Sequence, residues 1–353
     1  MGEVVFCKTN DGSVGLYNNK VEDIYHSTYG AYSESYEKFL QASNFLKYIN
    51  KNNKINILDV CYGIGYNTKA AINEILKFDK NFEVHIDALE YDKNLVNISP
   101  LLKQQKIDNS INTFLINNSN IDLTKSVYSI LKIFYEMKGI KYINWSNIII
   151  FLLKKLCMVV EKLLKHQNKS ILHNIYYDYI TARTKNQVKS TKFAKTSVVF
   201  HTEDARKSVQ RLNNKYNFIF HDAFTPKKLP TLWSLEFFKE LYRLLDDDGV
   251  LVTYSSSVAV RAAMLEAGFF VGRSIDKNGK NIGTIATKRE NLIKHELESV
   301  DLGLLKTTAG VFYRDENLTG LPEAILKRRD IEAQNSGRIT SSRFKKTWKK
   351  ITT

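Results

Sequence analysis

Apolar runs separated by polar turns recur in two parts of this chain. In residues 55–95, the run Ile55–Val60 leads into two glycines and a helical pattern, and a second run, Glu83–Glu90, follows. Residues 196–288 continue the alternation with three further runs, Ser197–Thr202, Tyr216–Asp222 and Val250–Tyr254. Strands that alternate with helices predict an α/β fold with a mostly parallel sheet.

Helical spacing predicts two helices between and after the later runs. A core-facing helix is predicted by apolar residues that recur on one face, namely Trp233, Phe237, Leu241, Leu244 and Leu245. A second helix covers Val258 to Ala267 and is ended by Gly268.

Turn residues predict how the sheet ends. Asp248-Gly249 precedes the run Val250–Tyr254, which is predicted to be another strand. Two short apolar segments, 269–272 and 284–287, flank a Lys-Asn-Gly-Lys turn and predict a hairpin. This hairpin adds an antiparallel edge to the sheet.

The pattern divides the chain into a lead-in, an interrupted core and an extension. Residues 1–50 are polar and tyrosine-rich, with a helix expected from Gly30 through Phe45. The core covers residues 51–290, and at about 120–192 a basic segment interrupts it that we expect to be a helical insertion, with its charges outward. Residues 291–353 form a C-terminal extension, and its stretch 338–350 contains six basic residues and no acid.

Charge and cysteine content narrow the class of protein. A net charge of +15 over 353 residues suggests a polyanionic partner, most simply nucleic acid, although a bias toward Lys, Asn and Ile is an alternative cause. Three scattered cysteines, Cys7, Cys61 and Cys157, argue against a disulfide scaffold or a metal site and favour a cytoplasmic protein. The apolar run 148–153 is too short to span a bilayer, so we expect no membrane anchor, with a membrane-surface helix as the alternative.

A glycine turn follows the first apolar run. Gly63 suits a positive φ, and Gly65 lets a ligand approach the main chain, where the helix that follows exposes backbone N–H groups. Thr68 stands where a dinucleotide fingerprint has its third glycine, which favours a mononucleoside such as S-adenosylmethionine over NAD. An ordinary turn is the alternative.

Acids follow three successive predicted strands. Glu90 ends the second strand, where α/β nucleotide folds hold ribose hydroxyls. Asp204 follows the next strand and is suited to accept a hydrogen bond from an adenine amino group, while Asp222 would face the reacting centre with Phe224 as a stacking surface. The alternatives are a solvated acid for Glu90 and helix N-caps for the two aspartates.

Several short motifs together resemble one enzyme family. They are Asp11-Gly12-Ser13 with Leu16-Tyr17, Tyr25-His26-Ser27 with Gly30-Ala31 and Glu34-Ser35, Gly63-Ile64-Gly65-Tyr66-Asn67, Asp204-Ala205-Arg206, Asp222-Ala223-Phe224-Thr225-Pro226-Lys227-Lys228 with Pro230 and Trp233, and Thr253-Tyr254-Ser255 with Val260-Arg261 and Ala267-Gly268-Phe269. Over about residues 8–120 and 195–345, the chain resembles the methyltransferase domain of the bacterial tRNA 5-methylaminomethyl-2-thiouridine biosynthesis family, the MnmC type. It is too short to carry the FAD oxidoreductase domain of that family's bifunctional members, so it resembles a stand-alone form.

The resemblance implies a fold, an activity and a set of site residues. The fold is Rossmann-like, of the class I methyltransferases, and the activity converts 5-aminomethyl-2-thiouridine to 5-methylaminomethyl-2-thiouridine in tRNA with S-adenosyl-L-methionine and no metal. Asn67 and Ala205 join the cofactor-binding residues, His26 and Glu34 close over the site beside Phe224, and Asp222 is the catalytic residue. A separate FAD oxidoreductase would act upstream.

Two rival functions use the same sequence features. A spermidine-synthase-like aminopropyltransferase shares the fold and the strand-end acids, but it needs further acids to hold a polyamine and would not be this basic. A non-catalytic RNA-binding protein with a relic cofactor pocket is the other rival, and the intact glycines and acids argue against it. Binding to bulk tRNA at low salt separates the first rival, and S-adenosylmethionine binding separates the second.

Overall fold

The computed structural model describes residues 4–19, 22–25, 29–122, 127–163, 193 and 195–352. The chain forms two compact units, each assembled from segments that are far apart in the sequence. The first unit comprises Met1–Ser35, Ile49–Lys54 and Tyr62–Thr202, and the second comprises Tyr36–Tyr48, Ile55–Cys61 and Glu203–Thr353.

The first unit begins with a small antiparallel sheet that the sequence pattern did not predict. Its strands are β1 (Val4–Lys8), β2 (Val14–Asn18) and β3 (Asp23–Ile24), in the order β1-β2-β3. The strands are five, five and two residues long, too short for a clear alternating pattern. The other elements of this unit are α1 (Ala31–Ser35), α3 (Tyr66–Ile75), β5 (Glu83–Leu89), α4 (Lys93–Ile98), η2 (Ser99–Leu101), α5 (Asn109–Asn118), α6 (Val127–Glu136), η3 (Ile140–Tyr142), α7 (Trp145–Leu163) and β6 (Thr196–His201).

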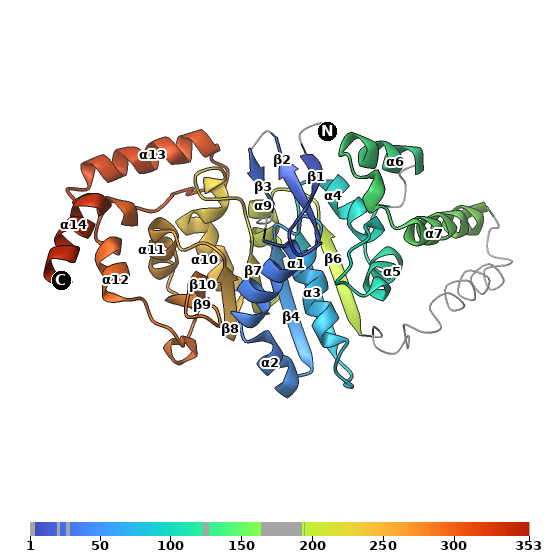
Figure 1. Cartoon of the computed structure of the whole chain (residues 1–353), viewed down its shortest axis with the longest axis horizontal. Helices are drawn as coiled ribbons and strands as arrows, with labels where there is room; N and C mark the ends of the chain where they lie inside the picture. Colours follow the sequence, from blue (N-terminus) through green and yellow to red (C-terminus); the bar gives the residue numbers. More distant parts are fainter. Residues whose placement is uncertain are drawn as a thin grey trace. The chain divides into compact units, whose positions relative to one another are not determined.

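The second unit holds most of the sheet and the C-terminal helices (Figure 1). Its elements are η1 (Tyr36–Gln41), most of α2 (Phe45–Lys51) and of β4 (Lys54–Val60), α9 (Ala205–Arg211), β7 (Tyr216–His221), η5 (Pro230–Trp233), α10 (Leu235–Leu244), β8 (Leu245–Thr253), α11 (Val258–Glu266), β9 (Phe270–Ile275), β10 (Asn281–Thr287), η6 (Glu290–Leu292), α12 (Ser299–Leu305), η7 (Thr308–Gly310), α13 (Pro322–Asn335) and α14 (Ser341–Thr352). The predicted helix at 233–245 is α10, whose N-cap Ser234 accepts a hydrogen bond from the Phe237 N–H.

The main sheet has seven strands in the order β6-β5-β4-β7-β8-β10-β9. β5 pairs in parallel with β6, and β7 pairs in parallel with both β4 and β8. β10 runs antiparallel to β8 and β9. The predicted α/β fold, the mostly parallel sheet and the antiparallel edge hairpin are therefore confirmed, with β9 as the outermost strand.

The expected continuous helix from Gly30 through Phe45 is wrong. The structure has α1, then the π-helix η1, then a turn, and only then α2. Asn44 in that turn has φ +56°, in the left-handed region, which no helix can include. The spacing of buried apolar residues continues on both sides of this turn, since Phe39 of η1 and Phe45 of α2 are both buried in the core.

Asp248 and Gly249, which precede the predicted strand Val250–Tyr254, lie inside β8, so the strand begins earlier than predicted, at Leu245. The pairing register between β7 and β8 shifts at this point, where Tyr216 pairs with Leu245 and Phe218 with Val250. A Cβ on Gly249 would stand 2.7 Å from the Tyr216 carbonyl oxygen. The glycine therefore serves a bulge with close backbone approach rather than a chain reversal.

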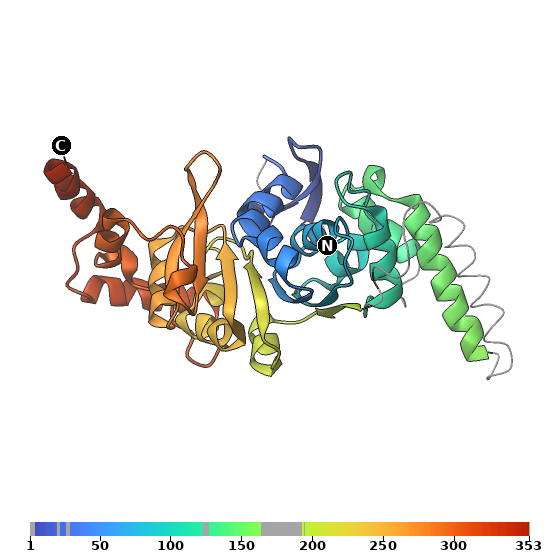
Figure 2. The ribbon, with the colours of Figure 1, turned by 90° about the horizontal axis from the view of Figure 1, so that it is seen from below.

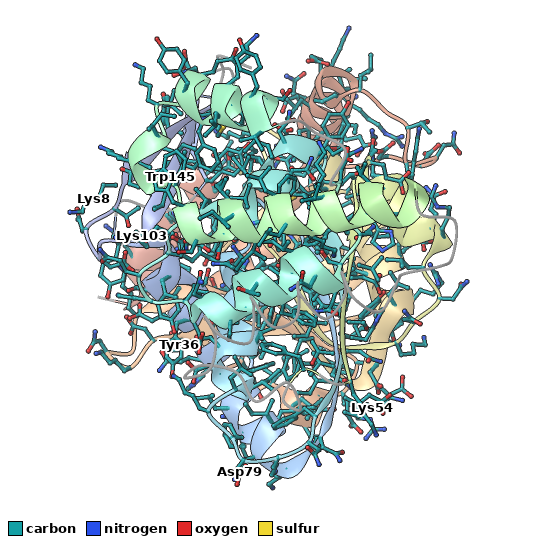
Figure 3. The ribbon with its side chains drawn as sticks, turned by 90° about the vertical axis from the view of Figure 1, so that its right-hand side faces the viewer. Lys8, Tyr36, Lys54, Asp79, Lys103 and Trp145 are labelled. Carbon is teal, nitrogen blue, oxygen red and sulfur yellow. The ribbon has the colours of Figure 1, made fainter. Side chains whose placement is uncertain are left out.

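The described part of the predicted insertion is helical, as expected, and consists of α6, η3 and α7. Figure 3 shows α7 lying across one side of the first unit, with Trp145 at its N-terminal end. Ile148 and Phe151 of α7 are buried, and Lys154 donates hydrogen bonds to the carbonyl oxygens of Ile116 and Asn117 at the end of α5. Residues 164–192 of the insertion lie outside the described residues. Within the described chain, no helix combines the length and apolar character needed to cross a bilayer.

The C-terminal extension is helical and tied to the second unit by buried ion pairs. Figure 2 shows α12, α13 and α14, coloured orange to red, gathered at one end of this unit. Arg261 of α11 is 3% exposed and donates to Asp301 of α12 at 3.0 Å and to Thr284 of β10 at 3.0 Å. The extension is thus part of the folded unit through Asp301.

Candidate functional site

The glycine turn joins β4 to α3 and bends sharply. Cys61, Gly63 and Gly65 have φ values of +69°, +57° and +84°, so every second residue is in the left-handed region. The Gly65 N–H donates to the Tyr62 carbonyl oxygen, and the Lys69 N–H donates to that of Gly65. The Tyr62 N–H donates to the Leu89 carbonyl oxygen at the end of β5. A left-handed non-glycine residue beside the turn is strained, which is typical of functional sites.

A side chain at Gly63 and one at Gly65 would meet different neighbours. A Cβ on Gly65 would stand 2.3 Å from the Tyr62 ring, so this glycine makes room for a neighbouring side chain of its own turn. Among the described residues, a Cβ on Gly63 would meet Tyr25, at 3.6 Å. The Gly63 position is therefore bordered by the Tyr25 ring at ordinary contact distance, and the close approach of a ligand at Gly65, which the sequence predicts, stays a prediction.

Glu90, which the sequence predicts to hold ribose hydroxyls, bonds to this turn. Its Oε2 accepts a hydrogen bond from the Gly63 N–H at 2.8 Å, and its Oε1 accepts one from the Asp92 N–H at 2.8 Å. Burial raises the pKa of Glu90 to about 7, because desolvation outweighs these two hydrogen bonds. Each oxygen keeps a further lone pair, so the carboxylate fits the two hydroxyls of a ribose.

A buried polar network that the sequence did not indicate supports the turn from behind. The Ile64 carbonyl oxygen accepts hydrogen bonds from Ser99 Oγ at 2.9 Å and Gln104 Nε2 at 3.4 Å. Lys69 is fully buried and donates to the Ser99 carbonyl oxygen at 2.8 Å and to Gln104 Oε1 at 2.7 Å. Burial lowers the pKa of Lys69 well below its usual value. Nothing in the sequence signals this, because a lysine in an amphipathic helix is expected to face water.

Asp204 caps α9 and pairs with an arginine. Its Oδ1 accepts from the Arg206 N–H at 3.0 Å, and its Oδ2 pairs with Arg206 Nη2 at 2.6 Å. Burial alone would raise the pKa of Asp204, but the bonds and charge of Arg206 outweigh it and lower that pKa. Arg206 also pairs with buried Asp315 at 2.8 Å. Ala205, the other predicted cofactor residue here, is the first residue of α9 and is 9% exposed.

Asp222 and Phe224 lie in a loop that its neighbours hold firmly. The Asp222 N–H donates to the Val60 carbonyl oxygen, which extends the pairing of β4 with β7 by one bond. The Phe224 carbonyl oxygen accepts from Trp233 Nε1 at 2.7 Å, and that of Ala223 accepts from the Tyr254 hydroxyl at 2.8 Å. The backbone that carries both predicted side chains is therefore fixed on either side of Ala223.

His221, just before Asp222, is a structural residue. It is fully buried, its Nε2 donates to the Leu232 carbonyl oxygen at 2.8 Å, and its ring lies 4.3 Å from that of Trp233. Burial lowers the pKa of His221 to about 4, so the ring is neutral near pH 7. His221 therefore packs at the start of the Asp222 loop as an uncharged ring.

The remaining predicted residues belong to the first unit. Asn67, in the first turn of α3, is 4% exposed. Glu34 lies in α1, is half-buried, and its N–H donates to the Gly30 carbonyl oxygen. His26 lies outside the described residues. Among the described side chains, no cluster of three or more His, Cys, Asp or Glu is suited to hold a metal ion.

Comparisons with known proteins define the class. Residues 166–289 match the family described as S-adenosyl-L-methionine-dependent methyltransferase. The chain is 26% identical, over 93% of its length, to 72% of an uncharacterized protein of Methanocaldococcus jannaschii. Over 66 residues it is 39% identical to the tRNA 5-methylaminomethyl-2-thiouridine biosynthesis bifunctional protein MnmC of Burkholderia vietnamiensis, which is 19% of this chain and 10% of that protein. The crystal structure of MnmC2 from Aquifex aeolicus superimposes with a TM-score of 0.61 at 24% identity, covering 94% of this chain and 85% of that one.

The fold and the family match over residues 166–289 therefore indicate an S-adenosyl-L-methionine-dependent methyltransferase, and S-adenosyl-L-methionine is its cofactor. More particularly, the resemblance to the MnmC-type methyltransferases that the motifs indicate is confirmed. The superposition confirms the Rossmann-like methyltransferase fold.

Proposed function

We propose that this methyltransferase acts on tRNA and methylates the aminomethyl group of a modified wobble uridine. The substrate would be 5-aminomethyl-2-thiouridine and the product 5-methylaminomethyl-2-thiouridine. The observation that carries the proposal is the placement of Asp222 directly after β7, in a loop whose backbone Trp233 and Tyr254 hold in place. The matching segment of proteins named for tRNA 5-methylaminomethyl-2-thiouridine biosynthesis supports the choice of substrate.

In this proposal Gly63 and Glu90 hold the nucleoside part of the cofactor. The Gly63 N–H donates to the Glu90 carboxylate, which would accept ribose hydroxyls while it stays bonded to the turn. Asn67, Asp204 and Ala205 complete the proposed cofactor contacts. S-adenosyl-L-methionine supplies an electrophilic methyl group on a sulfonium sulfur.

Asp222 would prepare the amine for reaction. A primary amine of this kind is mostly protonated near pH 7, and only its neutral form has a free lone pair. A carboxylate within hydrogen-bond reach accepts the proton or orients the lone pair toward the methyl group. Phe224 would stack on the uridine base, since RNA bases read one at a time are commonly held against aromatic rings. Glu34 and His26 are proposed to contact the substrate from the N-terminal segment.

The basic surplus suits an RNA substrate. The chain carries a net charge of +15, and α14 exposes Arg343, Lys345, Lys346 and Lys349. Phosphate contacts by such side chains position an RNA without reading its sequence. A cytoplasmic location and a separate FAD oxidoreductase acting earlier on the same uridine are parts of this proposal.

The experiment is methyl transfer to tRNA that lacks the final methyl group, measured for the wild type and for Asp222→Asn. We expect the variant to lose about a hundredfold or more in turnover, as when a general base is removed, and to keep its affinity for S-adenosylmethionine. Asp247→Asn, at an exposed acid in β8, is the matched control and should turn over normally. Near wild-type turnover by Asp222→Asn would show that Asp222 only anchors its loop.

A further inference from the structure

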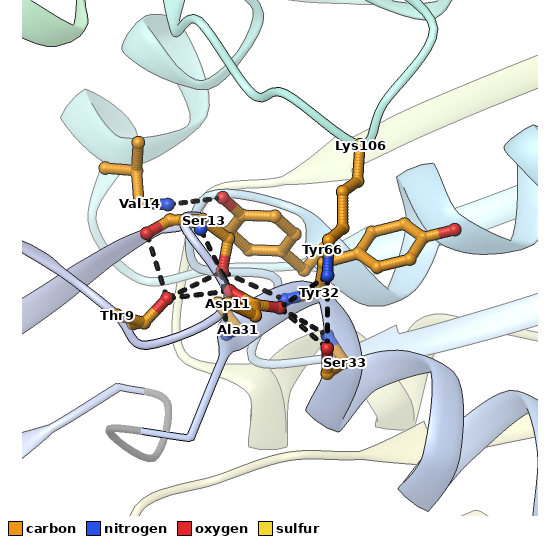
Figure 4. A network of polar contacts seen from close by, with 9 residues as sticks. All are labelled: Thr9, Asp11, Ser13, Val14, Ala31, Tyr32, Ser33, Tyr66 and Lys106. Atoms are coloured by element: carbon orange, nitrogen blue, oxygen red, sulfur yellow. Dashed lines mark hydrogen bonds and ion pairs between the residues drawn. The ribbon is translucent and has the colours of Figure 1, made fainter.

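Two N-terminal motifs that the proposed chemistry does not use meet in one place. Asp11-Gly12-Ser13 forms the turn between β1 and β2, and Gly30-Ala31 starts α1. Figure 4 shows their side chains and backbone groups joined in a single network with Tyr66 of α3. The network lies wholly within the first unit, which also contains Gly63 and Glu90.

Asp11 binds the N-terminus of α1. Its Oδ2 accepts hydrogen bonds from the Ser33 N–H at 3.0 Å and the Ser33 hydroxyl at 2.8 Å, and Lys106 lies 3.3 Å away. Its Oδ1 accepts from the Ser13 N–H at 2.9 Å and from the Ser13 hydroxyl. Burial alone would raise the pKa of Asp11, but the bonds from Ser13 and Ser33 outweigh it and hold that pKa well below the usual value. The hydrogen bonds of this turn therefore favour the ionised carboxylate form of Asp11.

Ser13 and Gly30 complete the contact. The Ser13 hydroxyl oxygen accepts from the Ala31 N–H at 2.9 Å and the Tyr32 N–H at 3.3 Å. A Cβ on Gly30 would stand 2.1 Å from the Asp11 carboxyl carbon, so a side chain there would displace the carboxylate. We call Asp11, Ser13, Ala31 and Ser33 the Asp11 clamp. Two side chains of one turn thus satisfy the free N–H groups at the start of α1.

The clamp is also joined to the helix that starts at the glycine turn. The Val14 N–H donates to the Tyr66 hydroxyl at 2.9 Å, and Tyr66 is the first residue of α3, next to Gly65. Tyr66 is 1% exposed, so this bond is shielded from water. The position of the β1–β2 turn is therefore fixed relative to α3.

The same small sheet presents an aromatic ring to Gly63. Tyr25 directly follows β3, and its N–H donates to the Leu16 carbonyl oxygen of β2 at 2.8 Å. Tyr25 Cδ1 lies 3.6 Å from the point where a Cβ of Gly63 would stand. The ring thus lies against Gly63, beside the turn that is proposed to hold the cofactor. Sequence reasoning had placed Tyr25 in a family motif without giving it a role.

We propose that Tyr25 is a cofactor-binding residue and that Asp11 and Ser13 are positioning residues, which hold the ring against the glycine turn. A contact made by a pre-positioned ring loses less conformational entropy on binding than one made by a free ring. The clamp would therefore raise affinity without touching the ligand. An effect of these residues on tRNA methylation rests on the proposed function. Their effect on the affinity for S-adenosylmethionine depends only on the cofactor.

The test measures the affinity for S-adenosylmethionine by calorimetry in Tyr25→Ala, Asp11→Asn and the double variant. Tyr25→Ala and Asp11→Asn should each weaken binding by about tenfold, equivalent to about 1.4 kcal/mol. The double variant should bind no more weakly than Tyr25→Ala, because Asp11 acts through Tyr25. Tyr25→Phe keeps the ring and should bind nearly as well as the wild type.

A matched control separates this role from general stability. Asp276 likewise accepts two backbone N–H bonds, from Asn278 and Lys280, in the exposed β9–β10 turn. Asp276→Asn should leave the affinity unchanged, and melting temperatures show whether each variant is folded. If Asp11→Asn is too unstable to measure, Tyr25→Ala alone tests the cofactor contact. Ser33→Ala, which removes one bond of the clamp, then takes the place of Asp11→Asn in the double variant.

Unchanged affinity in Tyr25→Ala, or effects of the two single variants that add in the double variant, would overturn the inference. The substrate proposal fails separately, if the wild type binds S-adenosylmethionine and methylates no tRNA.

Discussion

Gly65 and Lys69, near the start of α3, are each held in place by side chains packed around the glycine turn. Gly65 is a glycine because the Tyr62 ring occupies the space of its Cβ, and Lys69 is buried because it bonds to Ser99 and Gln104, about 30 residues away along the chain. The position of Glu90, by contrast, can be predicted from the sequence, because it ends an apolar run. Its partner in the structure is Gly63 of the glycine turn. Local patterns place residues at strand ends and turns, and tertiary contacts decide why each residue type is needed there.

Glu90 gives the cofactor site a dependence on pH. Its pKa in the folded protein is about 7, above the usual 4.5, so between these values the folded state binds a proton that the unfolded state lacks. Stability should therefore fall as the pH rises from about 4.5 to about 7, and then level off. Affinity for S-adenosylmethionine should rise over the same range, because the charged carboxylate is the better acceptor for ribose hydroxyls.

Glu90→Gln should remove both pH dependences, as followed by denaturant unfolding and calorimetry from about pH 5 to about pH 8. Glu83→Gln, at the exposed start of the same strand, is the control and should keep both. A Glu90→Gln protein with the wild-type pH profile of affinity would show that another group controls binding.

At the scale of elements, periodicity succeeded where an element is long or regularly flanked. The strands β4 to β7, the helices α10 and α11 and the β9–β10 hairpin are where apolar spacing and turn residues predict them, and β8 begins earlier than its predicted run. The short strands of the β1–β3 sheet were not predicted. The helix predicted from Gly30 is interrupted at Asn44, whose left-handed backbone conformation is not evident from its residue type. The start of β8 at Leu245 was not predicted, because the irregular pairing near Gly249 interrupts the apolar pattern there.

The helix α14 combines packing with exposed charge. The Phe344 and Trp348 rings lie 5.6 Å apart, and a Cβ on Gly303 of α12 would stand 2.1 Å from Phe344, so the aromatic side packs on α12. Replacing Lys345, Lys346 and Lys349 by Gln should weaken tRNA binding and reduce its dependence on salt, because fewer counterions are released. Removing residues 338–350 should have the same direction of effect. Cofactor affinity should stay the same in both variants.

Filter binding of tRNA at several salt concentrations measures this effect. The control replaces Lys277 and Lys280 of the exposed β9–β10 turn by Gln, and we expect it to bind as the wild type does. Equal affinity and an equal salt slope in the α14 variant would exclude this helix from the RNA contact.

At the scale of the whole molecule, chain order and compact units do not coincide. The first unit holds Gly63 and Glu90, and the second holds Asp204 and Asp222, with segments of both units alternating along the sequence. Patterns of composition follow the chain and predict a lead-in, an interrupted core and an extension. They cannot show that Tyr36–Tyr48 clusters with residues after Glu203, because strand order in a sheet differs from strand order in the chain.

The central claim is methyl transfer to the aminomethyl group of a tRNA uridine. The most direct measurement incubates the full chain with S-adenosylmethionine labelled in its methyl group and tRNA that contains 5-aminomethyl-2-thiouridine, followed by mass spectrometry of the nucleosides. We predict that the label appears in 5-methylaminomethyl-2-thiouridine and in no other nucleoside. A protein that binds S-adenosylmethionine but leaves that uridine unlabelled would contradict the account.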